Sequence, residues 1–249
     1  MTATEDGRIS AFARMREDDL IRHRVELLRQ APLFGVLPPQ ELGALATQCY
    51  AHRYRKGEMV FREGEPAERI LLIESGRVKL FNTSPQGNEL LVAVLGPGQI
   101  FGELAVIDRG PRAMSSRAME DVAVFSLGSD QFWTLLESHP ALARRLLELM
   151  ARRLRRADQN TQDLVFFDAP TRLARKLVEL AEEHGEPTGR SDEIRITVRV
   201  TQEEIAQMIG TTRASANRLI ASFSERGWID WNDGQPLLLS PEALLRRSR

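Results

Sequence analysis

Residues 49–132 alternate short apolar and polar segments between glycine-rich turns, and this pattern constrains the fold more than any other feature of the sequence. The segments that predict strands are 59–61, 70–73, 78–81, 90–95 and 122–127. Glycine, proline and asparagine, which favour turns, are common between them. Strands of this length and spacing predict a small antiparallel barrel or roll.

Helical periodicity follows the strands. Pro140 opens a predicted helix that reaches about residue 166, and its apolar spacing of three and four residues is typical of a coiled-coil seam. The predicted seam is Leu147, Met150, Leu154, Ala157, Thr161 and Leu164. We expect this helix to pair with a second copy of the chain, with support from elsewhere because Ala157 is small and Thr161 is polar. The alternative is a helix that packs on its own domain.

Shorter patterns complete the outline of the chain. A short helix is expected after Pro38 and Pro39, and an amphipathic helix over 171–183, after the break at Asp168 and Pro170. Residues 185–192 predict a loop, and the strict alternation over 194–200 predicts a half-buried strand. Residues 1–24 carry little apolar pattern and are interpreted as a partly helical extension.

Residues 201–223 predict two short helices joined by a tight turn. Thr201 is a good N-cap and Glu204 completes a capping box, while Gly210 can adopt the left-handed conformation that ends a helix. Thr212 caps the second helix, and the stretch 228–239 predicts a hairpin, or wing. This order predicts a helix-turn-helix unit; the alternative is an ordinary helical hairpin with a charged surface.

The second of these helices carries side chains suited to the major groove of DNA. Arg213 and Arg218 can make bidentate contacts to guanine, and Asn217 can do so to adenine. Hydroxyl groups near the start of such a helix are better placed for phosphates. The predicted DNA-binding residues are Thr201, Thr212, Arg213, Ser215, Asn217 and Arg218.

Residues 101–105 and 110–113 form the most distinctive part of the predicted roll. Gly102 permits close approach of the backbone, Arg112 offers a planar fork of donors to a phosphate, and Glu103 can accept from a ribose 2′-hydroxyl. A cyclic nucleotide needs this combination of groups. The alternative is a glycine-rich turn with an Arg–Glu pair on the surface.

Several stretches, in this order, resemble the cyclic AMP receptor protein (Crp–Fnr) family of bacterial transcription regulators. They are Gly57-Glu58, 63–65, 101–105 with 110–113, 150–154, Asp168, 201–210 and 213–218, and the resemblance extends from about Val25 to the C terminus. It implies an α+β fold with an N-terminal, jelly-roll-like β-roll that binds a cyclic nucleotide (25–137), a dimerisation helix (138–167) and a winged helix-turn-helix (168–249), after the extension 1–24.

The resemblance also implies partners. They are cyclic AMP as the effector in the roll, double-stranded DNA with a palindromic site, RNA polymerase and a second copy of the chain. The dimer helix is expected to close the nucleotide pocket, so that the nucleotide controls DNA affinity allosterically. The implied effector-binding residues are Gly102, Glu103, Leu104, Arg112, Ala113, Ala157 and Asp158.

The sequence departs from the family pattern at several positions. Ala113 replaces the commoner serine or threonine. Alanine at this position resembles the cyclic AMP sites of eukaryotic protein kinase regulatory subunits. Ala157 and Asp158 stand where the bacterial receptor presents a threonine and a serine to adenine, so the hydroxyls are lost although the carboxylate could accept from the adenine amino group. Ala214 replaces a glutamate of the recognition helix, which predicts a different half-site.

Composition excludes other classes of protein. The 249 residues include one cysteine, Cys49, which leaves no disulfide within the chain and no four-cysteine zinc or iron–sulfur site. His52 is the single histidine of residues 49–132, so a haem sensor is not expected. No metal-ligand or catalytic constellation predicts an enzyme. The polar N-terminus and the lack of a long apolar run predict a cytoplasmic protein without a membrane span or secretory signal.

A net charge of −1 does not exclude DNA binding, because only the contact face must be positive.

One alternative keeps the family and changes the effector. The chain would then be a regulator that responds to another molecule, or one that binds DNA without an effector.

Overall fold

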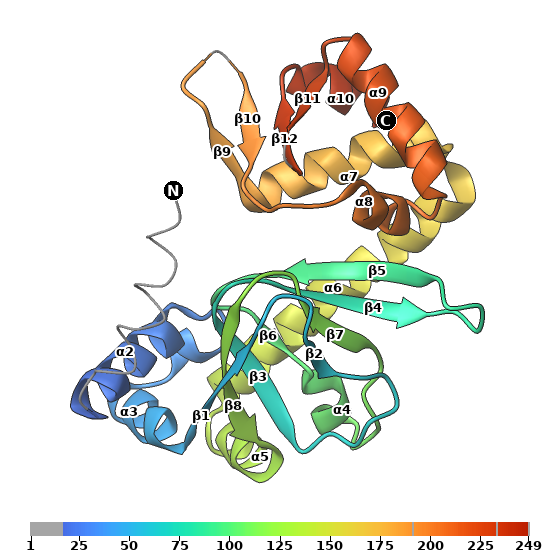
Figure 1. Cartoon of the computed structure of the whole chain (residues 1–249). Helices are drawn as coiled ribbons and strands as arrows, with labels where there is room; N and C mark the ends of the chain where they lie inside the picture. The colour runs from blue at the N-terminus through green and yellow to red at the C-terminus, as the bar shows by residue number, and fades with distance from the viewer. Residues whose placement is uncertain (1–16, 191, 233, 249) are drawn as a thin grey trace. The chain divides into compact units, whose positions relative to one another are not determined.

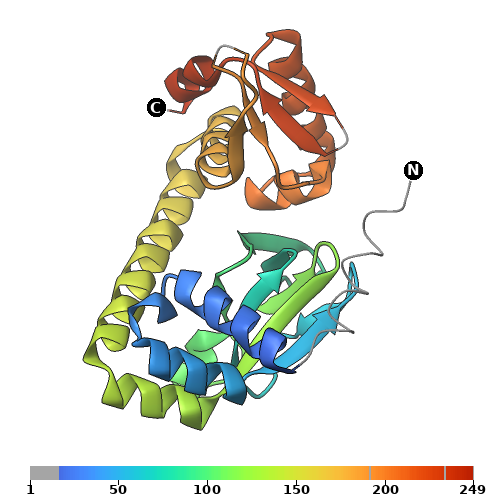
Figure 2. The same cartoon turned by 90° about the vertical axis from the view of Figure 1, so that its left-hand side faces the viewer.

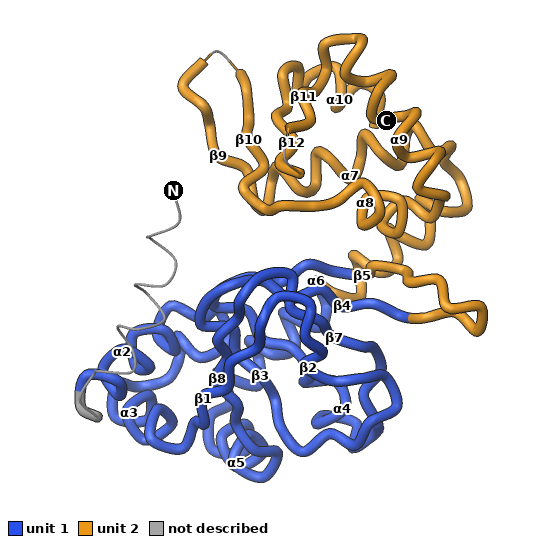
Figure 3. Tube along the Cα trace, viewed as in Figure 1, with its two compact units in different colours: residues 1–82, 93–152 blue, residues 83–92, 153–249 orange. Residues whose placement is uncertain are grey.

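The computed structural model describes residues 17–190, 192–232 and 234–248 and divides into two compact units (Figure 3). The first unit comprises Met1–Asn82 and Ala93–Arg152, and the second comprises Thr83–Val92 and Arg153–Arg249. The border falls inside helix α6 (Pro140–Phe166), which is one continuous helix of 27 residues (Figure 2).

The strands of the roll form two four-stranded sheets (Figure 1). The first has the order β1 (Tyr50–Tyr54), β8 (Val122–Gly128), β3 (Arg69–Ser75) and β6 (Ile100–Phe101). The second has the order β2 (Met59–Phe61), β7 (Ser115–Ala118), β4 (Val78–Thr83) and β5 (Glu89–Leu95). β1–β8, β3–β8, β3–β6, β2–β7 and β4–β7 pair antiparallel, so the predicted roll is confirmed.

Strand β3 divides the apolar interior of the first unit in two. Its alternate residues Leu71 and Ile73 join a buried cluster with Val78 of the second sheet. Ile70 and Leu72 point the other way, into a cluster with residues of the N-terminal helices. Successive side chains of a strand face opposite sides, so a strand buried on both faces is apolar throughout.

Helices cover the outer face of the first sheet: α2 (Glu17–Gln30), the 3-10 turn η1 (Phe34–Val36), α3 (Pro39–Gln48) and α5 (Ser129–Ser138). Pro39 occupies the first turn of α3, where its missing N–H has no partner to lose.

The predicted extension 1–24 ends within α2, which begins at Glu17. Residues 1–16 of that extension lie outside the described residues.

Strands β1, β6 and β7 were not predicted. β6 has only two residues, and β7 is Ser-Ser-Arg-Ala, which contains no large apolar side chain. β1 lies at the edge of its sheet and alternates weakly, because its sequence is Tyr-Ala-His-Arg-Tyr. Pairing with neighbours far along the chain, rather than local pattern, determines these three strands.

The second unit contains α7 (Ala169–His184), α8 (Gln202–Met208), α9 (Arg213–Glu225) and α10 (Pro241–Arg247). Its sheet has the order β11 (Ile229–Asn232), β12 (Gln235–Leu238), β10 (Ile194–Ile196) and β9 (Gly185–Pro187). Leu177 of α7, Ile205 of α8 and Ile220 of α9 are buried. The predicted wing is the β11–β12 hairpin, although Asp233 in its turn lies outside the described residues.

Two local predictions in this unit are corrected. The prediction of a loop over 185–192 is wrong for its first residues, because they form β9. This strand pairs antiparallel with β10, and Gly185 lies opposite Ile196. The strand over 194–200 ends early, at Ile196. Val198 and Val200 are buried but irregular, so alternation there reflects burial rather than sheet pairing.

Candidate functional site

Gly102 sits between strand β6 and helix α4 (Glu103–Ile107) in a left-handed conformation, with φ of 75°. A Cβ atom on this residue would lie 2.3 Å from Nη1 of Arg112 and 3.2 Å from its Cζ. Two features therefore require glycine at this position: the left-handed backbone conformation and the Arg112 guanidinium packed against the residue.

Arg112 is buried, with 6% of its surface exposed. Nη1 donates to the carbonyl oxygen of Gly102 at 2.6 Å, and Nη2 donates to that of Arg69 at 2.9 Å. The guanidinium carbon lies 4.3 Å from the centre of the Phe61 ring. Burial lowers the pKa of Arg112, while the charge of Glu103 opposes that shift. The roll thus holds a fixed buried cation at the turn.

Glu103 begins α4 and is 1% exposed. Its carboxylate is the largest favourable electrostatic influence on Arg112, so the structure brings together the two charged groups that the sequence predicted in one site. Leu104 and Ala113 are exposed beside them. The carbonyl oxygen of Ala113 accepts from Nδ2 of Asn82 at 3.2 Å.

Phe61, Arg69 and Asn82 were missed by the sequence analysis. Phe61 belonged to a predicted strand, and the strand pattern does not show which charged group its ring contacts. Arg69 contributes a backbone oxygen, which leaves no signature in the residue type. Their roles follow from the pairing of distant strands.

The predicted capping box of the helix-turn-helix is present. The backbone N of Thr201 donates to Oε2 of Glu204 at 2.8 Å, and the N of Glu204 donates to Oγ1 of Thr201 at 3.1 Å. Gly210 has a left-handed φ of 61° after α8. Oγ1 of Thr212 accepts from the N of Ser215 at 3.2 Å and caps α9.

Both parts of the chain match known family models. Residues 51–139 match the cyclic nucleotide-binding domain, and residues 171–247 match the Crp-like helix-turn-helix domain. The chain is 38% identical over 224 residues to the CRP-like cAMP-activated global transcriptional regulator of Mycobacterium tuberculosis, covering 90% of this chain and 99% of that protein. The chain belongs to the Crp–Fnr family of transcription regulators.

Two further proteins are similar to this chain. The cyclic AMP receptor protein of Thermus thermophilus is 31% identical over 207 residues, which cover 83% of this chain and 92% of that protein. The solved structure of a CooA mutant from Carboxydothermus hydrogenoformans has a TM-score of 0.71 at 26% identity and covers 83% of this chain and 90% of that one. These relatives support a transcription regulator with a helix-turn-helix DNA-binding domain.

On the recognition helix α9 of this Crp–Fnr member, Arg213 and Arg218 are exposed, as predicted for groove-facing residues. Asn217 differs from the prediction. It is half-buried, and its Oδ1 is covered without a hydrogen-bond partner among the described residues. A bidentate contact to adenine uses both amide atoms, so the contact needs another side-chain conformation of Asn217 and stays a prediction.

Arg172 of α7 was also missed. Its Nε donates to the carbonyl oxygen of Ile209 at 2.7 Å, and its Nη1 donates to that of Phe167 at 2.7 Å. One side chain therefore ties the end of α8 to the residue that follows α6. All these acceptors are backbone atoms, so residue types alone could not have identified the contact.

The predicted seam lies mostly at the surface of this Crp–Fnr member. Leu147 and Leu154 are 70% and 72% exposed, and Leu164 is also exposed. Met150 instead packs against the core of the first unit, and Oγ1 of Thr161 donates to the carbonyl oxygen of Ala157 within the helix. An exposed leucine stripe on one helix is unusual for a surface that faces only water.

Ala157 and Asp158 are exposed on the part of α6 that belongs to the second unit. Oδ2 of Asp158 accepts from Nε2 of Gln162 at 3.2 Å, so the carboxylate has a local partner on its own helix. The Gly102–Arg112 turn belongs to the first unit, and a shared site stays a proposal.

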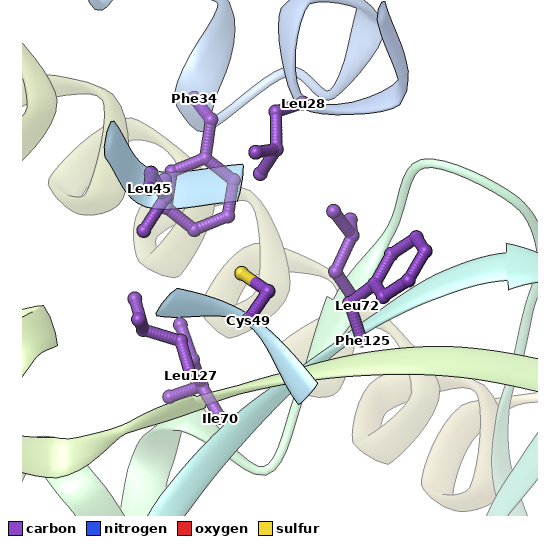
Figure 4. Close-up of a pocket in the computed structure, with 8 residues that line it drawn as sticks. All are labelled: Leu28, Phe34, Leu45, Cys49, Ile70, Leu72, Phe125 and Leu127. Atoms are coloured by element: carbon purple, nitrogen blue, oxygen red, sulfur yellow. The ribbon is translucent and has the colours of Figure 1, made fainter. Parts of the chain in front are cut away.

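Cys49 lines a small apolar pocket with Leu28, Phe34, Leu45, Ile70, Leu72, Phe125 and Leu127 (Figure 4). Burial raises the pKa of this thiol to about 11, against the opposing charge of Arg24. The thiolate is the reactive form, so this environment disfavours redox sensing at Cys49.

Across the described ranges no group of three or more His, Cys, Asp or Glu residues could hold a metal ion. Over the same part of the chain no helix is long and apolar enough to cross a membrane.

Proposed function

We propose that this chain is a homodimeric regulator that binds a palindromic DNA site and is controlled by a cyclic nucleotide, cyclic AMP, bound in the roll. The observation that carries the proposal is the packing of Arg112 against Gly102, with Glu103 buried beside them. A phosphate needs a cation and a close backbone, and a ribose hydroxyl needs an acceptor. These three residues supply those groups.

The proposed ligand contacts follow from this chemistry. Arg112 would hold the phosphate charge, Gly102 would let the backbone approach it, and Glu103 would accept from the 2′-hydroxyl. Leu104 and Ala113 would flank the nucleotide. Asp158, with Ala157, would meet the base from the dimer helix, where its carboxylate can accept from the amino group of adenine.

Dimer formation is supported by the exposed leucines of α6. Burying Leu147 and Leu154 against a second copy would remove their apolar surface from water. A two-fold dimer presents two recognition helices to half-sites about 34 Å apart. The nucleotide would shift the population between two arrangements of these helices, because it contacts one arrangement better.

The names of the Mycobacterium and Thermus relatives support cyclic AMP as the effector. We further propose RNA polymerase as a partner and the cytoplasm as the location, since a bacterial regulator of transcription acts where both DNA and polymerase are found.

Calorimetric titration tests the effector. Cyclic AMP and cyclic GMP are titrated separately into the wild type, Arg112→Ala and the control Arg55→Ala, whose side chain is exposed. We expect cyclic AMP to bind the wild type and the control and to raise their DNA affinity, with both effects lost in Arg112→Ala. Binding of cyclic GMP alone would point to another effector. If no nucleotide changes the affinity for DNA, the result would favour regulation without an effector.

A further inference from the structure

Three polar side chains at the start of α9 form a connected network. Oγ1 of Thr212 donates to Oγ of Ser215 at 3.1 Å, and Nη2 of Arg218 donates to the same oxygen at 3.1 Å. Oγ1 of Thr212 also accepts from the backbone N of Ser215. The helix cap and the exposed arginine therefore share Ser215 as their common acceptor.

Ser215 and Ser222 are the two serines that helical spacing places next to Arg218, and the guanidinium donates to Ser215. Residues three and four positions apart are adjacent on a helix surface. On the N-terminal side of Arg218 these neighbours are Ser215 and Ala214, and alanine offers no side-chain acceptor. Fixing a long side chain before binding reduces the entropy lost when it meets a base.

We infer that Ser215 is a positioning residue that sets the base preference of Arg218, rather than only a contact to phosphate. This inference rests on the proposed reading of DNA by α9. With both lone pairs of its oxygen accepting from Thr212 and Arg218, the hydroxyl orients the guanidinium fork along one direction. A bidentate contact to guanine depends on that direction.

The test selects binding sites from randomised DNA, with and without cyclic AMP. The proteins are the wild type, Ser215→Ala, Ser215→Thr, Arg218→Ala and the Ser215→Ala/Arg218→Ala double variant. Ser224→Ala is the matched control, because it is an exposed serine on the same helix. Affinity for the selected site and its single-base variants is then measured over a series of salt concentrations.

We expect Ser215→Ala to lose about tenfold discrimination at the base pair that Arg218→Ala also affects, and to leave other base pairs unchanged. The double variant should discriminate no worse than Arg218→Ala, and Ser215→Thr should retain the preference because its hydroxyl remains.

Uniform weakening on all sequences, with the salt slope unchanged because a serine hydroxyl neutralises no phosphate charge, would show a phosphate contact and overturn the inference. Unchanged discrimination in Ser215→Ala would also overturn it. If the wild type selects no sequence at all, the DNA-reading function itself fails, which is a distinct result.

Discussion

Arg247 of the C-terminal helix α10 binds both carboxylate oxygens of Asp168, with Nη2 at 2.9 Å from each. Asp168 is also the N-cap of α7, since its Oδ1 accepts from the backbone N of Thr171 at 2.9 Å. Helix α10 is thereby joined to the N-cap of α7, 79 residues earlier in the chain.

The Asp168 carboxylate predicts a stability change in acid. Hydrogen bonds from the Thr171 hydroxyl and backbone N, with the charge of Arg247, lower its pKa to about 2 from 3.8. Because the pKa is lower in the folded state, the stabilisation is full above pH 3.8 and is lost as pH falls towards 2. Denaturation midpoints of the wild type and Asp168→Asn should differ at pH 6 and converge near pH 2. An equal difference at both pH values would contradict this.

Removing the partner cation should weaken the same cap. Arg247→Ala is expected to raise the pKa of Asp168 and to destabilise the second unit by about 0.2–1 kcal/mol, the range of exposed ion pairs. Arg246→Ala is the control, because Arg246 pairs within α10, with Glu242 at 3.6 Å. Carbon NMR of the Asp168 carboxyl in both variants measures the pKa. Equal values in the two variants would contradict the prediction.

Substitution at Gly102 should separate backbone strain from steric displacement. Gly102→Ala forces an L-residue into a left-handed conformation, at about 1–2 kcal/mol, and also pushes against Arg112. Gly98→Ala is the matched control, because Gly98 has a φ of 79° and no atom within 4 Å of the added Cβ. We expect both variants to lose thermal stability and only Gly102→Ala to lose nucleotide binding in calorimetry. Normal binding by Gly102→Ala would contradict the role of this contact.

A charge in the leucine stripe should prevent pairing. Each leucine buried at an interface contributes about 1.5–3 kcal/mol, and a two-fold dimer loses that contribution twice. Leu154→Glu is therefore expected to sediment as a monomer at concentrations where the wild type and the exposed control Arg155→Ala are dimers. A Leu154→Glu dimer of unchanged affinity would place the interface elsewhere.

Local signals predicted the parts of the fold that local chemistry determines. The capping box at Thr201 and Glu204, the left-handed Gly210 and the helix opened by Pro140 all depend on neighbours within a few residues. Glu103 and Arg112 were predicted to serve one site, and their charges do interact in the structure, because both lie on one short stretch.

Contacts between residues far apart in the sequence could not be predicted. Arg172 reaches a carbonyl 37 residues away, and Arg247 reaches a carboxylate 79 residues away. Asn217 was assigned to the groove by helical spacing alone, yet the packing of α9 covers one of its amide atoms. Position around a helix predicts a face, whereas burial also depends on what packs beside it.

The burial of Cys49 makes the protein suitable for site-directed labelling. It is the single cysteine of the sequence, it is 7% exposed, and its pKa of about 11 keeps it protonated at neutral pH. A thiol introduced on the exposed face of α9 would react first with a spin label or dye, without replacement of the native residue. Distances between labelled copies can then be followed as nucleotide is added, while slow modification of Cys49 reports opening of the first unit's core.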